Sequence, residues 1–111
     1  MKHEMNLNRK PFESIKNGSK TIELRLYDEK RQKLNIGDEI IFTNRETDEK
    51  MTVKIENLHI YPSFNELYKH FDKISMGYKE DEEAKPEDME EYYSIEEQKQ
   101  YGVVGIEIKR I

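Results

Sequence analysis

The sequence predicts an α+β fold, in which about five or six mostly antiparallel strands curl toward a closed or nearly closed barrel with short helices beside it. Several segments alternate apolar and polar residues with the period of two that is typical of strands. Residues 51–61 change their apolar phase part-way, which indicates a bulged strand, and bulged strands help a sheet to close. Two Ser-x-x-Glu motifs mark the starts of short helices.

The first part of the chain predicts a strand, a short helix and a second strand. Residues 3–7 form the first strand, and residues 11–17 form the helix. Pro11 suits the first helical turn, where its missing N–H costs nothing, and Gly18 suits the left-handed conformation that ends a helix. The second strand covers residues 20–26, with apolar and polar residues in alternation.

The middle of the chain predicts two further strands and a second helix. A strand over residues 39–44 follows a turn, and a polar hairpin connection leads to the long strand over residues 51–61. Ser63 and Glu66 form a capping box for a helix over residues 64–71. The apolar and aromatic residues of this helix recur at i, i+3, i+4 and i+7, which favours a role in the core over the stacking of bases.

The last third of the chain predicts a loop, two short helices and a closing strand. Residues 72–86 are polar and acidic, which is typical of a solvated loop. A helix is expected over residues 86–93, and a second one starts at the capping box of Ser94 and ends near Gly102. Residues 103–111 alternate as a strand.

Length and composition limit the class of protein. The chain has 111 residues, and we assign residues 1–111 to a single domain. Charged residues make up 39% and hydrophobic residues 34%, but the apolar residues fall into periodic runs, which favours a folded body over a disordered chain. No segment reads as a membrane span or a signal peptide, so we expect a cytoplasmic protein that does not contact a membrane. The absence of Cys excludes disulfides and thiol catalysis.

Charge is distributed unevenly along the chain. The formal net charge is −5, which argues against general binding of polyanions. Residues 1–33 hold nine basic and five acidic residues, a local net charge of +4, whereas the other residues carry −9. A locally basic region suits a selective pocket for phosphates, although chance variation of surface charge explains the same numbers.

One segment places three charged side chains at a predicted strand. Residues 18–25 read Gly-Ser-Lys-Thr-Ile-Glu-Leu-Arg. Glu23 and Arg25 share a strand face, and Lys20 joins them only if the backbone bends near Gly18. The ordinary explanation is an exposed ion pair, which contributes about 0 to 1 kcal/mol. The alternative is a small polar constellation that holds a ligand.

Other kinds of site are not supported by the sequence. The three histidines show no ligand spacing, and no Walker loop, dinucleotide fingerprint or nucleophile elbow is present, so we expect neither a metal nor a cofactor. Arg25 suits the binding of phosphate, carboxylate or a base, and Glu23 suits an exocyclic amine or the anchoring of Arg25. Lys20 acts as a base or nucleophile only if its surroundings favour the neutral amine. Binding is therefore chemically easier to satisfy than turnover.

The form Gly-x-Lys-x-x-Glu-x-Arg after a short helix with Pro-Phe resembles the signature of the ASCH domain family, which is related to the PUA RNA-binding domains. Residues 5–18, 35–42 and 101–108 are similar to the opening strand and helix, an internal strand and the closing strand of that family. The resemblance covers nearly the whole chain and implies a PUA-like β-barrel with flanking short helices.

The resemblance implies that a cleft beside the signature strand binds RNA, a nucleotide or a nucleoside. The expected ligand-binding residues are Lys20, Glu23 and Arg25 in the cleft, with Arg9, Lys10 and Arg31 as outer cations for phosphate.

A hydrolase is the alternative function. Some small bacterial ASCH proteins are amidohydrolases that release acetate from acetylcytidine with a Lys, a Thr and a Glu, and another member is described as a ribonuclease. Lys20 matches the lysine, Glu23 stands where the threonine is expected, and Thr21 offers a hydroxyl nearby. The third catalytic residue cannot be aligned. A third class is a protein-interaction module that uses the acidic residues 80–83.

Overall fold

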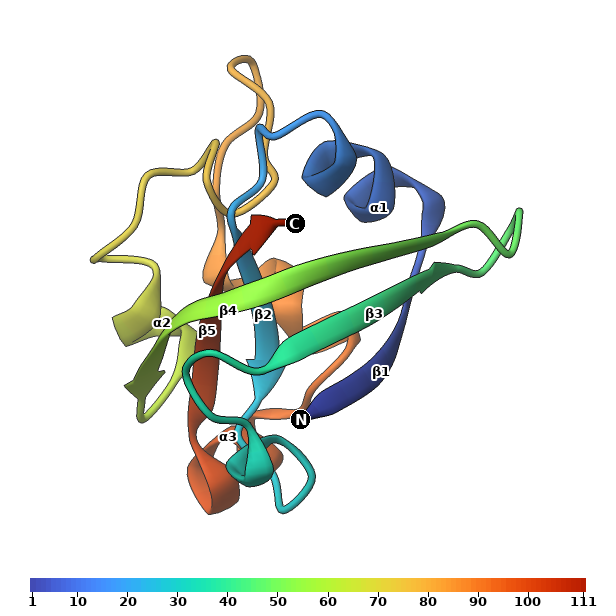
Figure 1. The fold of residues 1–111 in the computed structure, drawn as a ribbon. Helices are drawn as coiled ribbons and strands as arrows, with labels where there is room; N and C mark the ends of the chain where they lie inside the picture. Colours follow the sequence, from blue (N-terminus) through green and yellow to red (C-terminus); the bar gives the residue numbers. More distant parts are fainter.

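The framework of the protein is a five-stranded mixed sheet that curls into a half-barrel (Figure 1). The computed structural model describes all residues, 1–111. The strands are β1 (Lys2–Leu7), β2 (Ile22–Leu26), β3 (Glu39–Asn44), β4 (Lys50–Tyr61) and β5 (Val103–Arg110). The helices are α1 (Arg9–Lys16), α2 (Phe64–Leu67) and α3 (Ile95–Tyr101), with 3-10 turns η1 (Arg31–Lys33) and η2 (Pro86–Glu91).

The strand order is β1-β3-β4-β5-β2, so the first two strands of the chain form the two edges of the sheet. β1 runs parallel to β3, and the other three pairs are antiparallel. The α+β class with mostly antiparallel strands is therefore confirmed. β4 has a register irregularity between Ile55 and Asn57, where the change of apolar phase predicted a bulge.

Two apolar clusters hold the sheet in place. The larger cluster has 13 buried residues from β1, α1, β3, β4, β5 and Leu34, and Phe12 and Ile15 of α1 belong to it. The smaller cluster has six buried residues and joins β2 and the start of β5 to α2 and Met76. Successive residues of β5 alternate between the clusters, since Val103 belongs to the smaller one and Val104 to the larger one. Helices thus cover both faces of the sheet.

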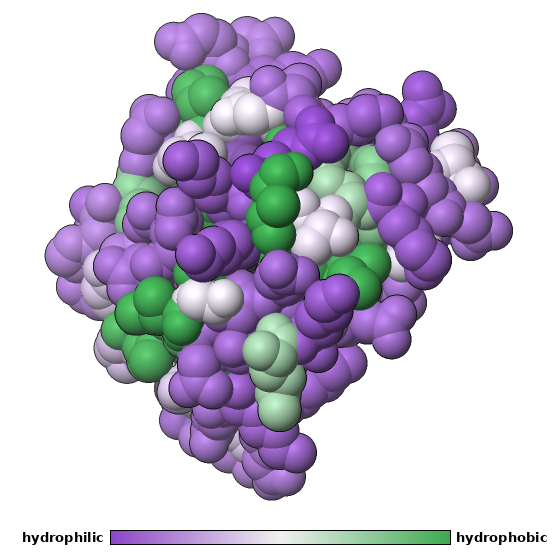
Figure 2. Space-filling view, viewed as in Figure 1, coloured by the Kyte–Doolittle hydropathy of each residue, from purple (hydrophilic) through white to green (hydrophobic).

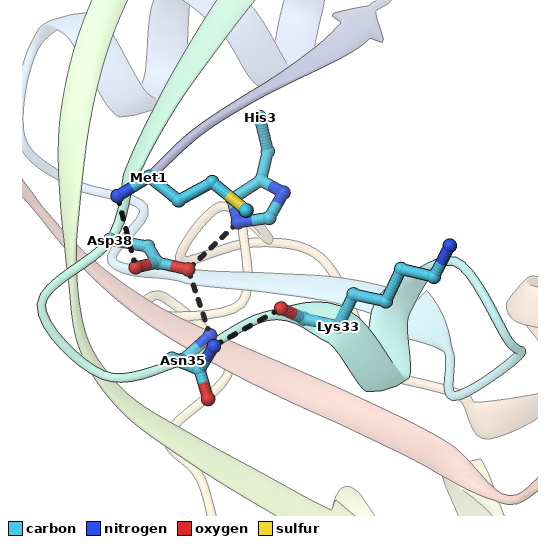
Figure 3. Close-up of polar contacts among 5 residues, drawn as sticks. All are labelled: Met1, His3, Lys33, Asn35 and Asp38. Atoms are coloured by element: carbon cyan, nitrogen blue, oxygen red, sulfur yellow. Dashed lines mark hydrogen bonds and ion pairs between the residues drawn. The ribbon is translucent and has the colours of Figure 1, made fainter.

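A turn before β3 ties the start of the chain to the sheet (Figure 3). The Asp38 carboxylate lies 2.8 Å from Nε2 of His3, accepts from the backbone N–H of Asn35 at 3.1 Å and contacts the amine of Met1 at 3.4 Å. The hydrogen bond with His3 is the main reason why the pKa of Asp38 lies below its usual value. These contacts hold β1 in its parallel register beside β3.

Three predicted helices differ in detail from the observed ones. α1 begins at Arg9, two residues before the predicted start. α2 ends at Leu67, four residues before the predicted end. The Glu66 carboxylate contacts Lys69 and His70 instead of completing its capping box, whereas the second capping box, of Ser94, is complete. Residues 86–91 form a 3-10 turn instead of an α-helix, and four of its six residues are acidic and repel one another at helical spacing.

The prediction of a solvated loop is wrong for the first part of residues 72–86. The carbonyl of Ser75 accepts the backbone N–H groups of Thr21 and Ile22, each at 2.9 Å, and Met76 is buried. This segment therefore lies alongside β2, as the yellow and orange ribbon in Figure 1 shows. Met76 is a single apolar residue in a polar segment, so hydrophobic periodicity could not show that it anchors the loop in the core.

The surface is mainly polar. On the face drawn in Figure 2, hydrophilic residues dominate, and hydrophobic residues show only as small separate areas. None of the helices combines the length and the apolar character that crossing a bilayer requires.

Candidate functional site

β2 turns its charged side chains toward the concave side of the half-barrel. In the ladder with β5, Glu23 lies opposite Ile106 and Arg25 lies opposite Val104, and both β5 residues belong to the larger core cluster. Ile22 and Leu24, which alternate with them along β2, belong to the smaller cluster on the other face of the sheet. The shared face of Glu23 and Arg25 is confirmed, but it is not a solvated face, because Glu23 is only 4% exposed.

One carboxylate is shared by two cations. Nζ of Lys20 lies 3.0 Å from Oε1 of Glu23, and Nε of Arg25 lies 2.7 Å from Oε2. The side chains of Lys20, Glu23 and Arg25 are 10%, 6% and 12% exposed, respectively. The ion cluster formed by these three residues therefore carries a net charge of +1, and the ammonium of Lys20 keeps donors beyond the one that Glu23 accepts.

Backbone geometry brings Lys20 into the ion cluster. Gly18 has a φ of +89°, which allows the bend that joins α1 to β2, and the N–H of Lys20 then donates to the carbonyl of Ser14 at 3.0 Å. The lysine stem passes over Gly77, where a Cβ would lie 3.0 Å from Cδ of Lys20. A residue without a side chain at position 77 therefore makes room for the lysine.

Opposite charges outweigh burial within the ion cluster. Burial alone raises the pKa of Glu23, but the charges and hydrogen bonds of Lys20 and Arg25 hold this pKa below its usual value. Burial alone lowers the pKa of Arg25, but Glu23 and the nearby hydroxyl of Tyr93 have the larger effect, so this pKa lies above its usual value. Both partners of the Glu23–Arg25 pair are therefore charged at neutral pH.

Arg25 also connects the two edges of the sheet. Its Nη2 donates to the carbonyl of Asn6 in β1 at 3.1 Å. β1 and β2 do not pair through their backbones, so the half-barrel has an open seam between them, and this side-chain contact bridges the seam.

A cavity of about 380 Å³ opens at the seam. All three residues of the ion cluster line it, together with Tyr68, Tyr78, Tyr92 and Tyr93. The hydroxyls of Tyr68 and Tyr78 lie 2.9 Å apart, and that of Tyr78 donates to Oδ2 of Asp88 at 2.8 Å. Burial is the main cause that raises the pKa of both tyrosines, so their hydroxyls keep their protons at neutral pH. The cavity has the size of a small-molecule site, with buried cations on one wall and phenol groups on another.

Comparison with known proteins assigns the chain to a family. The family model of the ASCH domain matches residues 5–111. The chain belongs to the ASCH domain family. The family that the sequence signature indicated is therefore confirmed over essentially the whole chain.

Two solved structures are similar to this ASCH domain over its full length. The crystal structure of hypothetical protein PH0355 is 37% identical, with a TM-score of 0.84, and the alignment covers 100% of both chains. The solution NMR structure of protein PF0455 from Pyrococcus furiosus is 34% identical, with a TM-score of 0.73, and the alignment covers 100% of this chain and 98% of the other. No curated protein matches the chain. These similarities support the α+β half-barrel, and neither name states an activity.

The outer cations expected from the sequence have different places in the ASCH domain. Lys10 lines the cavity, and its Nζ lies 3.5 Å from Oε2 of Glu82. Arg9 is exposed next to it and lines a neighbouring hollow. Arg31 does not line the cavity, because its guanidinium turns back to Asp28, three residues earlier, at 2.9 Å.

Thr21 is not part of the cavity wall. It is exposed at the entrance of β2, and its backbone N–H donates to the carbonyl of Ser75. The structure therefore brings Lys10, Lys20, Glu23 and Arg25 together and leaves Thr21 and Arg31 outside.

Sequence reasoning missed the aromatic part of the site. Four of the seven tyrosines of the chain line the cavity, and all four lie between residues 68 and 93. Tyr68 lies in the predicted helix over residues 64–71, whose aromatic face was assigned to the core. Tyr78 lies in the predicted loop, and Tyr92 and Tyr93 lie at the end of the predicted helix over residues 86–93. The concentration of tyrosines in that region was the only signal for them. Arg45 also lines the cavity, and no feature of the sequence indicated this.

The ASCH domain offers no obvious metal site. No group of three or more His, Asp or Glu side chains is placed to hold a metal ion. Both oxygens of Glu23 are engaged by cations, so this carboxylate is poorly suited to metal coordination.

Proposed function

We propose that this ASCH domain binds a nucleotide or nucleoside unit, free or as part of RNA, in the cavity beside β2. The supporting observation is the buried ion cluster of Lys20, Glu23 and Arg25, whose net positive charge borders a cavity with tyrosine walls. Ammonium and guanidinium groups bind phosphate and base oxygens, and phenol rings stack on bases. The cavity therefore offers cations for the phosphate of a nucleotide and aromatic rings for its base.

Glu23 has a positioning role in this proposal. Its two oxygens hold Lys20 and Arg25 on opposite sides, and its pKa is below the usual value. The carboxylate thus fixes the direction of both cations and leaves their remaining donors for the ligand.

Hydrolysis of an acylated nucleoside such as acetylcytidine is a second candidate. Water would add to the acetyl carbonyl, and the C–N bond would break with transfer of a proton to the cytosine amine, so that acetate and cytidine are released; Lys20 in the cavity wall would act as base or nucleophile. Lys20 must first lose a proton, and Glu23 is a poor acceptor because of its lowered pKa. Thr21 supplies no hydroxyl to the cavity. The site therefore supports ligand binding better than it supports hydrolysis of an acylated nucleoside or cleavage of RNA.

Calorimetry with the four ribonucleosides and their 5′-monophosphates tests the binding proposal. Lys20→Met keeps the length of the stem over Gly77 but removes the ammonium. We expect at least one monophosphate to bind, and we expect Lys20→Met to weaken its affinity about tenfold or more, because a charge-assisted hydrogen bond is lost. Lys109→Met, at an exposed position outside the cavity, is the matched control and should bind as the unchanged protein does.

Two results would overturn the binding proposal. One is the absence of binding by any nucleoside or monophosphate, and the other is equal affinity of Lys20→Met and the unchanged protein. Acetate release from acetylcytidine, or cleavage of RNA, that stops in Lys20→Met would instead favour a hydrolase. The cytoplasmic location expected from the sequence stays a prediction, and fractionation of cells tests it.

A further inference from the structure

Three side chains that line the cavity, those of Tyr68, Tyr78 and Asp88, are joined by hydrogen bonds. They come from three segments: Tyr68 is the last residue of α2 at its C-cap, Tyr78 lies in the following loop, and Asp88 lies in η2. The two hydroxyl oxygens lie 2.9 Å apart, and the hydroxyl of Tyr78 lies 2.8 Å from Oδ2 of Asp88. We call these three residues the phenol chain.

The direction of each hydrogen bond in the phenol chain is fixed. A carboxylate only accepts, so Tyr78 donates its single proton to Asp88. The other group within reach of this hydroxyl, the carbonyl of Lys85 at 3.3 Å, also only accepts. Tyr78 therefore has no proton left for Tyr68, and the hydrogen bond between the two tyrosines is donated by Tyr68. Burial is the main cause that raises the pKa of both tyrosines, so neither loses its proton at neutral pH.

The phenol chain therefore offers a ligand acceptors and no donors. Both hydroxyl protons are used within the chain, which leaves lone pairs on the two phenol oxygens and on Oδ1 of Asp88, an atom without a hydrogen bond in the protein. Lys20 and Arg25, which line the same cavity, have only donors. The cavity thus separates its hydrogen-bonding groups into donors at the ion cluster and acceptors at the phenol chain.

Glu23 cannot supply the acceptors for a base. The sequence suggested that it accepts from an exocyclic amine, but its two oxygens are engaged by Lys20 and Arg25. The acceptors of the phenol chain are available for that role. Cytosine and adenine carry an amino group, a donor, where uracil and hypoxanthine carry an oxo group, an acceptor. The bases therefore differ in the property that the phenol chain distinguishes.

We propose that the cavity selects nucleotides whose base carries an exocyclic amino group, and that the phenol chain determines this preference. The inference rests on the proposed function and adds the class of base. The phosphate meets the cations of the cavity, and the amino group donates to the phenol chain. An oxo group in the same place sets its lone pairs against those of Tyr68, Tyr78 and Asp88, and the acceptors on both sides lose their hydrogen bonds to water without a replacement.

Calorimetry with matched pairs of monophosphates tests the inference. Cytidine and uridine monophosphates differ by an amino and an oxo group at one ring position, and so do adenosine and inosine monophosphates. Guanosine monophosphate carries one amino group more than inosine monophosphate. We expect at least one amino-bearing member to bind about tenfold or more tightly than its partner. No partner without the amino group should be the tighter ligand of its pair.

Substitutions in the phenol chain should lower the ratio of the two affinities within a pair. Asp88→Asn introduces an amide that can donate to Tyr78, so the direction of the hydrogen bonds is no longer fixed, and Tyr78→Phe removes the middle hydroxyl. We expect each to reduce the ratio about threefold or more. Glu90→Gln is the matched control, because it removes a carboxylate from the same η2 turn at an exposed position outside the cavity, and it should keep the ratio.

The ratio separates base selection from damage to the fold, because a disturbed cavity weakens both members of a pair. Lys20→Met should likewise weaken both members and keep the ratio. The inference fails if the members of every pair bind equally, if an oxo member binds more tightly, or if the ratio persists in both Asp88→Asn and Tyr78→Phe. A ratio that falls as far in Glu90→Gln as in Asp88→Asn also overturns it.

Each of these results would leave the proposed function in place, provided that monophosphate binding depends on Lys20. If no monophosphate binds, the proposed function and the inference fail together.

Discussion

Glu23 determines the chemistry of the site at the scale of single residues. On an exposed strand its contacts with Lys20 and Arg25 would contribute little, because water screens them. Here all three side chains are almost completely buried, so each charge depends on the others for the solvation it has lost. The arrangement leaves one positive charge without a partner, which is the physical reason to expect an anionic ligand.

Replacement of Glu23 should destabilise the protein strongly. Glu23→Gln leaves two buried cations without their counter-charge, and we expect the free energy of unfolding to fall by about 3 to 5 kcal/mol, as for other broken buried pairs. Urea denaturation followed by circular dichroism measures it. The control is Glu46→Gln, since Glu46 meets Arg9 only at 3.9 Å on the surface, and its effect should stay below about 0.5 kcal/mol. Equal effects of the two substitutions would contradict the structural role of the ion cluster.

The effect of Glu23→Gln should depend on pH. The pKa of Glu23 in the folded protein is below the usual value of 4.5, so the unfolded chain takes up its proton first as pH falls. The stabilisation from this carboxylate is fully present above about pH 4.5 and is lost as pH falls through the folded pKa. The difference in unfolding free energy between the unchanged protein and Glu23→Gln should therefore shrink toward acidic pH. Denaturation curves at several pH values test this, and a difference that grew in acid would have the wrong sign.

At the scale of elements, the site depends on a loop that holds an edge strand. Residues 75–77 lie against the start of β2, where the Ser75 carbonyl accepts two backbone N–H groups and Gly77 leaves space for the stem of Lys20. β2 is a short edge strand, paired only with β5, and the loop gives it a second support. The position of the lysine is therefore set by two segments that are more than 50 residues apart in the sequence.

Gly77→Ala should damage both stability and binding. Its φ is +106°, and the new Cβ would lie 3.0 Å from Cδ of Lys20, so backbone strain and displacement of the lysine act together. We expect a loss of about 1 to 3 kcal/mol in stability and weaker binding of the monophosphate. Gly37→Ala is the matched control, because its φ is +94° but nothing lies within 4 Å of the added Cβ. It should lose stability but keep its affinity, and a similar loss of affinity in both variants would refute the role of Gly77.

Local patterns predicted the elements that depend on neighbouring residues. The strands, the bend at Gly18, the bulge after Ile55 and the capping box of Ser94 agree with the structure because each follows from a period or a short motif. The family signature also placed Lys20 and its two partners together. These features need no knowledge of how distant segments meet.

The remaining features depend on contacts that no local pattern contains. The four tyrosines that line the cavity lie just after α2, in the following loop and just after η2, and only the folded chain brings them to one cavity. Arg31 was expected near the cavity because of its charge, but Asp28, three residues earlier, holds it elsewhere. The burial of Glu23 was also hidden, because an alternating strand does not reveal which of its faces meets the core.

At the scale of the whole molecule, the half-barrel is closed by a side chain and not by a backbone ladder. The two edge strands of the sheet meet where Arg25 reaches from β2 to the carbonyl of Asn6 in β1. A cavity can exist at this seam because no strand pairing fills it. The same feature makes the seam a weak point, since one guanidinium replaces a row of backbone hydrogen bonds.

Arg25→Lys should therefore loosen the seam while it keeps the charge. A lysine can still pair with Glu23, but its single ammonium cannot reproduce the planar fork that also reaches Asn6. Hydrogen exchange measured by mass spectrometry should become faster in β1 and β2, whereas β4, in the middle of the sheet, should keep its protection. Arg110→Lys is the control, because Arg110 also donates to a backbone carbonyl, that of Lys16 at 3.0 Å, but lies outside the seam. Unchanged exchange in β1 and β2 of Arg25→Lys would mean that packing of α1 and the apolar core, and not the guanidinium, holds the half-barrel closed.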